Sequence, residues 1–239
     1  MTFGENSQLT SIGYDAFNNC SSLTSITIPD SVTSIDDYAF SYCSSLTSIV
    51  IPDSVTDIGE GAFYGCPIAD ATASCSAIGN ISGEYLETVV LTSGESINSY
   101  AFRNCYNLKS IDIPDSVTSI GWDAFYNCNS LESIDIPEGV TSIGPSAFYN
   151  CTSLTSIVIP DNVTTIGLYA FQECTSLTSV TFGENSQLES IGDCAFYGTS
   201  LTSIVIPDSV TSIGEGSLRY CSNLESVTFE ENSQLKIIA

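Results

Sequence analysis

Cysteines are the residues of this 239-residue chain whose number and spacing most suggest chemistry. Eight of the ten recur at corresponding places, mostly 23 residues apart: Cys20, Cys43, Cys66, Cys105, Cys128, Cys151, Cys174 and Cys221. If such positions stack, their Cβ vectors run parallel about 4.8 Å apart, whereas a disulfide needs converging vectors and Cβ atoms about 3.8 Å apart. We therefore expect a ladder of buried thiols that pack as small apolar side chains. Cys75 and Cys194 lie outside it, and Cys194 is a candidate for an exposed thiol.

The residues that activate nucleophiles or bind zinc are scarce. The chain has no histidine, which removes the commonest general base and the commonest zinc ligand, and it has no Cys-x-x-Cys pair. Serine and aspartate are plentiful, but without a histidine or a suitably placed lysine nothing would activate a serine hydroxyl. Glycine-rich phosphate-binding motifs are absent as well. We predict that the chain is not an enzyme and carries no cofactor.

An acidic residue follows the proline of most repeats. The series consists of Asp30, Asp53, Asp115, Glu138, Asp161 and Asp208. Stacked carboxylates about 5 Å apart would repel one another, and a calcium ion between neighbouring coils would relieve that repulsion. Calcium prefers six or more oxygen ligands, however, and the serines beside these residues supply few. We therefore favour a role in the turn, where each carboxylate accepts a backbone N–H, and keep calcium as the weaker alternative.

The overall charge restricts the partners. The 28 acidic residues outweigh four basic ones, Arg103, Lys109, Arg219 and Lys236, and give a net charge of −24. Such a charge repels phosphate backbones and anionic lipids, which argues against nucleic acids and membrane surfaces. No apolar run approaches the roughly 20 residues that span a bilayer, and residues 1–30 lack the features of a signal peptide. Cationic proteins, cations and neutral surfaces remain as partners.

A 23-residue repeat must position all of these residues. The phrase SLTSIVIPDSVTSIG at 200–214 stands almost unchanged at 45–59, and leucines mark the same interval from Leu23 to Leu46 and from Leu108 to Leu131. The consensus is L-T-S-I-x-I-P-D-S-V-T-S-I-G-x-x-A-F-x-x-C-x-S. One such unit is too small to bury its apolar residues alone, whereas stacked units share a continuous core. The period therefore predicts a solenoid.

Each unit has a predictable course. The L-T-S-I-x-I segment is expected to be a short strand with its first, fourth and sixth side chains inward, which in one copy are Leu46, Ile49 and Ile51. Pro52 then ends strand pairing because it has no N–H to donate. After the glycine, the x-x-Ala-Phe segment suits one short helical turn on the return side of the coil, with the alanine and phenylalanine buried.

The period breaks between Phe63 and Phe102, which are 39 residues apart. We interpret residues 68–85 as a degenerate, shortened coil with a weak strand at 71–73. Residues 1–239 then form a single leucine-rich solenoid of about eleven coils, each with one short parallel strand. Both ends stop in mid-repeat, with part of a strand at 1–3, so we expect a piece of a longer array. Uncapped ends would favour end-to-end association between molecules.

The motif L-T-S-I-x-I-P-D-S-V-T-S-I-G-x-x-A-F-x-x-C resembles the BspA-like leucine-rich repeats, and the match recurs along essentially the whole chain. The irregular stretch from Cys66 to Phe102 resembles the divergent repeats found inside such arrays. The resemblance implies a surface or secreted protein that acts in adhesion to extracellular or host proteins. It implies no enzymatic activity and brings no catalytic residues.

Outward positions of the predicted strands offer one candidate surface. Most carry threonine or serine, which suit a solvated sheet face, and that is the simpler interpretation. The alternative is a surface that binds proteins or glycans. In that case Asp112, Glu132 and Asp135 would contribute, because they form the densest acidic patch among these positions.

Aromatic residues on the return side offer a second candidate surface. Trp122 stands where other units have glutamate, so its ring is expected to be partly exposed. Tyr126 and Tyr149 are equivalent residues in successive units and should stack on one another. Tyrosine and tryptophan are favoured anchors in protein interfaces. Residues 109–149 thus form the least repetitive part of the predicted surface.

The sequence leads us to expect a non-enzymatic adhesion or protein-binding module that is displayed outside the cell. Weak contacts repeated along a rod would add up through effective concentration. The alternative is a passive spacer that holds other domains away from a surface. A spacer requires a given length and tolerates changes of outward side chains, whereas a binding module does not.

Overall fold

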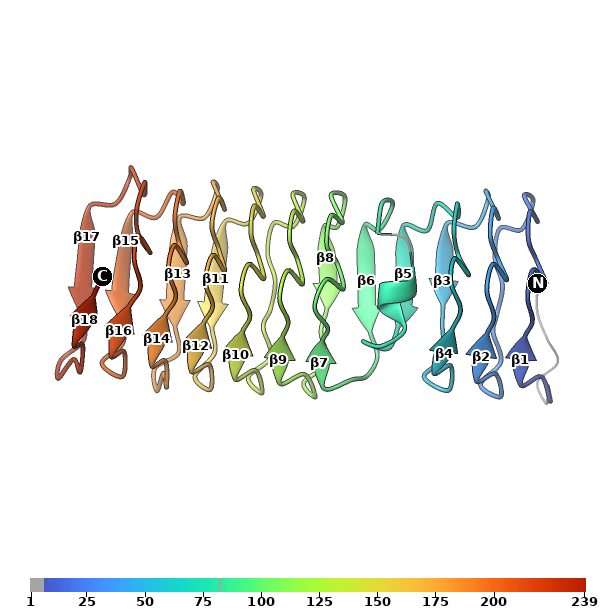
Figure 1. Ribbon diagram of the computed structural model, residues 1–239, viewed down its shortest axis with the longest axis horizontal. Coiled ribbons are helices and arrows are strands. Elements are labelled where there is room, and N and C mark those ends of the chain that lie inside the picture. The colour runs from blue at the N-terminus through green and yellow to red at the C-terminus, as the bar shows by residue number, and fades with distance from the viewer. Residues whose placement is uncertain (1–6, 82) are drawn as a thin grey trace.

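The computed structural model describes residues 7–81 and 83–239 as one elongated stack of coils (Figure 1). Successive coils lie side by side, and the chain advances from one end of the stack to the other. The solenoid that the period predicts is confirmed. The partial strand expected at residues 1–3 lies outside the described residues.

In most coils the first strand lies where the Leu-Thr-Ser-Ile motif predicts it, but residues 23–28, which carry this motif, and 131–136, which carry a close variant, form no strand. The first strands are β3 (Ser48–Val50), β5 (Asp70–Ala73), β6 (Thr88–Leu91), β8 (Ser110–Asp112), β11 (Ser156–Ile159), β13 (Ser179–Phe182), β15 (Ser203–Ile206) and β17 (Ser226–Phe229). They pair in parallel within three sheets, β3-β5-β6-β8, β11-β13 and β15-β17, and in register, so that Val89 lies opposite Ile111. Leu46, Ile49 and Ile51 are buried, as the alternation of side chains along a strand requires.

Most coils contain a second strand that the sequence analysis does not anticipate. These strands are β1 (Ser11–Ile12), β2 (Ser34–Ile35), β4 (Asp57–Ile58), β7 (Ser96–Ile97), β9 (Ser119–Ile120), β10 (Ser142–Ile143), β12 (Thr165–Ile166), β14 (Ser190–Ile191), β16 (Ser212–Ile213) and β18 (Ile237–Ile238). They form one three-stranded and one seven-stranded parallel sheet. The coils number about ten, close to the eleven expected.

The return side of each coil consists of turns, and the short helix expected there is not found in the described coils. The N–H of Phe40 donates to the carbonyl of Ala62 in the next coil (2.7 Å), while the N–H of Ser41 donates to Tyr38 in its own coil (3.0 Å). Because every second N–H bonds the neighbouring coil, the continuous bonding of an α-helix cannot form. The described residues do contain one 3₁₀ helix, η1 (Ile78–Asn80), in the degenerate coil.

Left-handed backbone conformations make these alternating turns possible. Two residues per turn, four positions apart, have positive φ, such as Gly61 (61°) with Gly65 (72°) and Tyr100 (67°) with Asn104 (63°). Glycine adopts this region without strain, and asparagine tolerates it better than most residues. The glycines and asparagines at these places are therefore the sequence signal for turns rather than for a helix.

Phenylalanines form the centre of the core. The rings of Phe102, Phe125, Phe148, Phe171 and Phe196 stack in nearly parallel planes, with neighbouring centroids 5.1 to 5.4 Å apart. All five are fully buried. A shorter stack of Phe17, Phe40 and Phe63 serves the N-terminal coils. The phenylalanine ladder thus gives the repeated core that a single unit could not form alone.

The buried thiol ladder is confirmed for seven of its eight cysteines, and all ten cysteines are free. The thiol of Cys66 donates to the carbonyl oxygen of Phe40 (3.0 Å), and the same bond recurs along the ladder. Burial raises the pKa of Cys66 to about 11 and that of Cys105 to about 12. Cys20 is the correction, since it is exposed: no described coil packs on its outer side.

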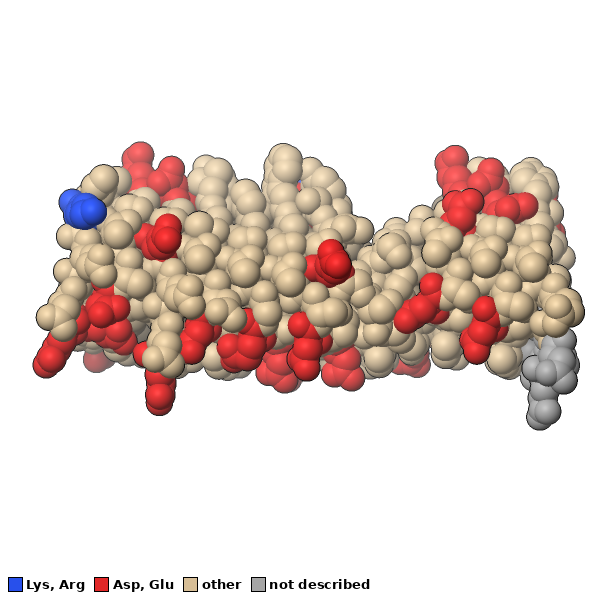
Figure 2. All heavy atoms as spheres, turned by 90° about the horizontal axis from the view of Figure 1, so that it is seen from below, with Lys and Arg blue, Asp and Glu red and all other residues tan. Residues whose placement is uncertain are grey.

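The degenerate coil at residues 68–85 interrupts the regular stack. Its strand β5 includes the expected residues 71–73 and pairs with β3 and β6, so the first-strand sheet continues through it. Helix η1 stands in place of a second strand, and β4 and β7 belong to different sheets. Figure 2 shows the surface hollowed on one side at this point of the stack. Residue 82 lies outside the described residues.

Candidate binding surface

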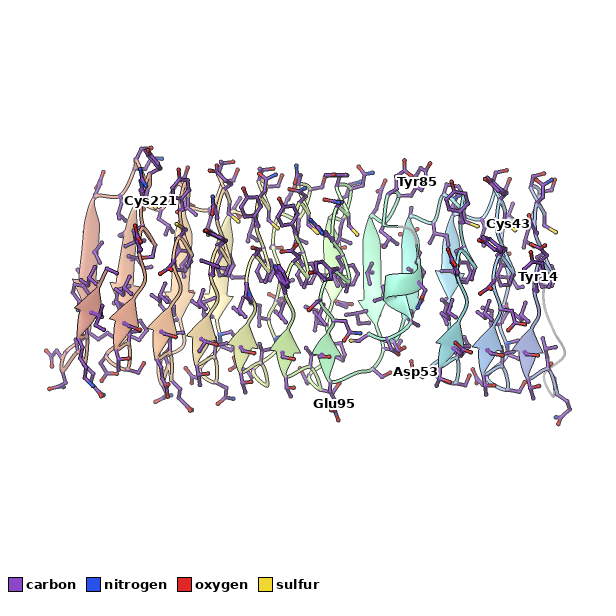
Figure 3. The ribbon with its side chains drawn as sticks, viewed as in Figure 1. Tyr14, Cys43, Asp53, Tyr85, Glu95 and Cys221 are labelled. Carbon is purple, nitrogen blue, oxygen red and sulfur yellow. The ribbon has the colours of Figure 1, made fainter. Side chains whose placement is uncertain are left out.

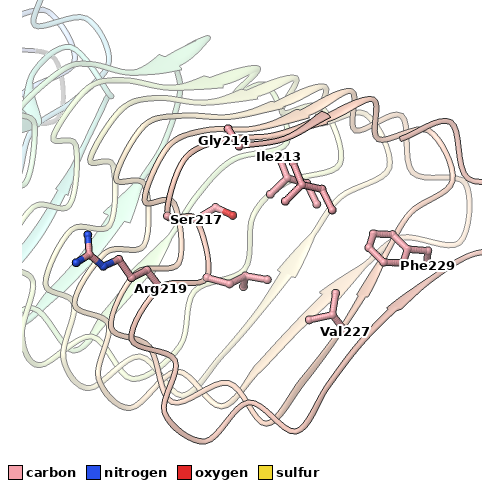
Figure 4. A pocket seen from close by; sticks show the side chains of 10 residues that line it. Ile213, Gly214, Ser217, Arg219, Val227 and Phe229 are labelled. Atoms are coloured by element: carbon pink, nitrogen blue, oxygen red, sulfur yellow. The ribbon is translucent and has the colours of Figure 1, made fainter. Parts of the chain in front are cut away.

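The outward side chains of a coil, which Figure 3 draws as sticks together with the inward ones, lie on two faces. We call the outward residues of the first strands the strand face, and those of the turns between the second strand and the cysteine position the return face. Figure 4 shows the two parts of a coil across from one another, with Val227 on β17 and Arg219 in the turn. By repeat position, Asp112, Glu132 and Asp135 belong to the strand face, and Trp122, Tyr126 and Tyr149 belong to the return face.

The acidic and the aromatic residues between 109 and 149 therefore do not form one surface. They are close in sequence, but each coil folds back on itself between its strand and its turns. The structure brings the three aromatic residues together and places the three acidic residues elsewhere. The two groups have to be considered as separate sites.

Several polar side chains on the strand face bond to a neighbouring coil. The hydroxyl of Thr178 donates to the carbonyl of Thr155 in the preceding coil (3.2 Å), and the same bond links Thr155 to Glu132 (3.4 Å). Lys109 and Glu87 form an exposed ion pair with an N–O distance of 2.5 Å. The strand face also exposes valines, such as Val50 and Val158, which are both 60% exposed, so it is a mixed polar and apolar surface.

The return face carries a cluster of aromatic rings around one arginine. The rings of Tyr126 and Tyr149 stack with centroids 4.7 Å apart and planes 4° apart, as the sequence predicts. Tyr100 and Trp122 lie 5.6 Å apart, and the guanidinium carbon of Arg103 is 5.5 Å from the Tyr100 ring and 5.1 Å from the Tyr126 ring. Such cation–π contacts fix the orientation of the rings. We call these five residues the aromatic cluster.

Asp123 supports the aromatic cluster from below. Its side chain is only 8% exposed, and its Oδ2 lies 3.5 Å from Nε of Arg103. Burial raises the pKa of this carboxyl, while the charge of Arg103 and a hydrogen bond from Trp122 oppose that rise. Sequence analysis missed Asp123, Arg103 and Tyr100, because only the stacking of coils brings them together.

An apolar hollow of about 460 Å³ adjoins the cluster. It is lined by Trp122, Asp123, Tyr126, Pro145, Ser146, Leu168 and Tyr169. Trp122 is 53% exposed, which confirms the sequence prediction, and Leu168 is 39% exposed. Asp123 and Ser146 are buried, so the groups that a ligand could contact in this hollow are mainly rings and aliphatic carbons. Aromatic walls with few polar groups are typical of places where proteins accept an apolar side chain.

Two further hollows lie nearer the C-terminal end. One, of about 360 Å³, shares Tyr169 with the apolar hollow and is otherwise lined by Asp193, Cys194, Glu215, Gly216 and Arg219. Cys194, a candidate exposed thiol, is partly exposed there. The other, also about 360 Å³, opens into the last coils between Ile213 and Phe229 (Figure 4).

Two of the acidic residues after the prolines, Asp53 and Asp161, bond to other coils rather than within their own turns. The turn after Pro52 is closed by its carbonyl oxygen, which accepts the N–H of Val55 (3.0 Å). The carboxylate of Asp161 accepts the N–H of Asn185 in the next coil (3.0 Å), and Asp53 accepts the hydroxyl of Thr92. Turn capping is therefore the wrong role for these two residues. Among the described residues, no three acidic or cysteine side chains come together as a metal site.

The whole sequence matches one repeat family. The BspA type leucine-rich repeat region matches residues 1–85, 82–187 and 141–238 in six copies. No curated protein sequence matches the chain. The described part of the chain contains no helix with the length and apolarity needed to cross a bilayer.

Several solved structures resemble this chain. A leucine-rich cell surface protein from Faecalibacterium prausnitzii is 30% identical, with 100% of this chain and 62% of that one covered and a TM-score of 0.45. A leucine-rich repeat protein from Bacteroides ovatus is 27% identical over 94% of this chain and 77% of its own, with a TM-score of 0.44. The chain thus spans less than two thirds of the Faecalibacterium protein.

Proposed function

Because the chain belongs to the BspA-type leucine-rich repeat family, we propose that it is a non-enzymatic, protein-binding adhesion module displayed outside the cell. The observation that carries the proposal is the return-face aromatic cluster with its adjoining apolar hollow. Trp122 is the sole tryptophan of the chain, and it stands half exposed beside tyrosines. Exposed tryptophan and tyrosine with arginine are the residues that dominate binding energy in protein interfaces.

One relative supports the proposed location outside the cell. The Faecalibacterium structure is described as a cell surface protein. An acidic, elongated rod suits such a place, because its charge keeps it soluble and its length presents many positions at once. Extracellular and host proteins are the proposed partners, with glycans as a further class of ligand.

The alternative function is a passive spacer. Its support is the near identity of repeats such as 45–59 and 200–214, since a spacer needs length and no particular outward residue. The change of residue type along the return face, from Trp122 to Glu215, supports binding over spacing, because a spacer needs no particular outward residue.

Binding of the purified chain to immobilised extracellular-matrix and serum proteins tests the proposal. The return-face variant combines Trp122→Ala, Tyr126→Ala and Leu168→Ala. Its matched control combines Asp112→Ala, Glu132→Ala and Asp135→Ala, three changes on the strand face. We expect saturable binding that the return-face variant loses and the control retains. Binding is measured with and without calcium, and binding that requires calcium would restore the acidic residues after the prolines as ligands.

Loss of binding in the control alone would place the site on the strand face. No saturable binding by the folded wild-type chain would leave the spacer as the better explanation. Circular dichroism before each experiment ensures that the variants are folded.

A further inference from the structure

One outward position of the return face changes its chemistry along the stack. We define the post-strand position as the second residue after each second strand. From the N-terminal end it reads Tyr14, Asp37, Glu60, Ser99, Trp122, Pro145, Leu168, Asp193 and Glu215. Three consecutive coils in the middle are apolar at this position, and the two coils that follow are acidic.

Hydrogen bonds show that these post-strand residues are stacked neighbours. The N–H of Glu215 donates to Oδ1 of Asp193 (2.8 Å), and the N–H of Trp122 donates to the hydroxyl of Ser99 (3.2 Å). The residues therefore form a line along the long axis of the solenoid, with one residue per coil at about 4.8 Å spacing.

The hollows follow the same line. The apolar hollow lies at Trp122, Pro145 and Leu168, and the second hollow lies at Asp193 and Glu215. Tyr169 lines both, so the two adjoin one another. One surface thus offers an apolar compartment and, next to it, an acidic one.

The lining of the acidic hollow keeps an excess of negative charge, because Asp193 and Glu215 outnumber Arg219. Arg103 is held by Asp123 and by two tyrosine rings. Arg219 also lines the acidic hollow, but its guanidinium lies over the ring of Tyr220 (4.9 Å) and donates to that hydroxyl (3.3 Å). With a net charge of −24, the chain as a whole attracts basic partners.

From this line of residues we infer that the two adjoining hollows bind an extended segment of a partner protein, with apolar side chains over Trp122–Leu168 and basic side chains over Asp193 and Glu215. The inference rests on the proposed protein-binding function and names the chemistry of its partner. The centres of the two compartments are two to three coils apart, or about 12 Å at about 4.8 Å per coil. An extended chain advances about 3.4 Å per residue, so about four residues separate the apolar anchor from the basic one.

A sugar ring fits the apolar hollow less well than an apolar side chain does. Sugars need several hydrogen-bonding groups, whereas the carboxylate of Asp123 is buried and paired with Arg103. The surface that remains consists of ring and aliphatic carbon, whose burial is favourable for an apolar side chain.

Fluorescence of Trp122 gives a direct test, because this sole tryptophan lines the apolar hollow. The probe is a nine-residue peptide of glycine and serine with leucines at its second and fourth positions and arginines at its sixth and eighth. Two control peptides replace the arginines by glutamates or the leucines by serines. We expect the first peptide to change Trp122 emission saturably and to bind about tenfold or more tightly than either control.

A charge-neutral variant and its matched control locate the acidic half. Asp193→Asn with Glu215→Gln removes both charges while the amide oxygen can still accept the N–H of residue 215. Asp37→Asn with Glu60→Gln makes the same changes at the same position of two other coils, where the N–H of Glu60 donates to Asp37 (2.8 Å). We expect the first variant to bind the leucine–arginine peptide about tenfold more weakly than the wild-type chain does, and the second variant to bind it with unchanged affinity.

Three results would overturn the inference: no saturable change of emission, equal binding of the glutamate peptide, or equal weakening by both variants. Competition by a neutral oligosaccharide would also contradict the inference, because it would show that the hollow binds a glycan instead of a basic peptide segment. Failure of the adhesion proposal is separate, since peptide binding at Trp122 can persist when the chain captures no extracellular protein.

Discussion

The strand face and the return face are built on the same repeat and share one core, yet they differ in how their polar and apolar groups are engaged. On the strand face, threonine hydroxyls bond to carbonyls of the preceding coil, as Thr178 does to Thr155. On the return face, aromatic rings and Leu168 border an open hollow, and the buried Asp123 holds Arg103 beneath them.

This contrast indicates which positions of the repeat can change to bind a specific partner. Inward positions must fit the coils on both sides, so changes there disturb the stack. A strand-face hydroxyl such as that of Thr178 adds only one exposed hydrogen bond to the neighbouring coil. A half-exposed residue such as Trp122 has to fit only its own backbone conformation and the side chain that it contacts in the neighbouring coil. The return face can therefore vary from coil to coil, as the post-strand position does from Trp122 to Glu215.

The largest effect is expected from breaking the core that both faces share. Phe148→Ala removes a fully buried ring that stacks on Phe125 and Phe171 at 5.1 Å on either side. We expect the free energy of unfolding to fall by about 3 to 5 kcal/mol, measured by urea denaturation, with loss of binding at the return face. Val158→Ala, at a strand-face residue that is 60% exposed, is the matched control with a small effect. Equal destabilisation by the two substitutions would contradict the core described above.

Removing one aromatic anchor from the return face comes next. Trp122→Ala should reduce the affinity for a protein partner by about 2 kcal/mol, or about 30-fold, because an exposed ring in a hollow is a typical binding anchor. Stability should change little, since the ring is half exposed. Surface plasmon resonance and thermal unfolding measure the two effects. A large drop in Tm with unchanged affinity would show that Trp122 is structural instead.

The buried thiol ladder should make the stability of the core depend on pH. The folded pKa values of Cys66 and Cys105, about 11 and about 12, lie above the ordinary value of 9.0. Since the unfolded chain loses these protons first, stability should be full below pH 9 and should fall as pH rises from 9 toward 11. Thermal unfolding of the reduced protein across this range measures the fall.

Alkylation at neutral pH gives the matching kinetic measurement. Cys20 and Cys194, which are not buried, should react in the folded protein, whereas Cys66 and Cys105 should react only in denaturant. Mass spectrometry of the labelled chain distinguishes the sites. Rapid labelling of Cys105 in the folded protein would contradict its burial.

The smallest effect is expected on the strand face. Thr178→Val removes the hydroxyl that donates to Thr155 but keeps the β-branched shape that suits a strand. We expect a loss of about 0.5 to 1.5 kcal/mol in stability, typical of one hydrogen bond, and no loss of binding. Urea denaturation and surface plasmon resonance measure these quantities. Weakened binding in this variant would bring the strand face into recognition.

The inward residues were predictable because they repeat with the coil. Leu46, Ile49 and Ile51 follow from strand alternation, and the thiol ladder follows from the geometry that disulfides require. The stacking of Tyr126 on Tyr149 follows from equivalent positions in successive coils. Each of these predictions uses only the period and the direction of side chains.

The turns and the second strands were harder to predict because their cause is the neighbouring coil. Ser-Ile pairs such as Ser119–Ile120 are too short to indicate a strand until an identical pair lies beside them. The x-x-Ala-Phe segment looks helical by itself, but its alternate N–H groups bond the next coil. Residue types that tolerate positive φ, such as Asn104 and Gly65, are the local sequence feature that could have indicated turns.

The candidate site was only half predictable for a related reason. Trp122 and Tyr126 stand out by residue type, but Asp112 and Asp135 were grouped with them by sequence distance. Repeat position, rather than sequence distance, decides the face of a residue in a solenoid. Arranging the post-strand residues in a column would have shown that Leu168 and Trp122 lie on one line.

Quenching of Trp122 fluorescence in the presence of a captured partner protein would show directly whether the partner binds the return face. Acrylamide quenches an exposed indole, and Trp122 is the sole tryptophan of the chain. A tryptophan-free partner or partner fragment keeps the signal specific. If recognition occurs on the return face, saturation with the partner should reduce the quenching constant severalfold. Unchanged quenching at full saturation would contradict recognition on the return face and place the partner on another surface.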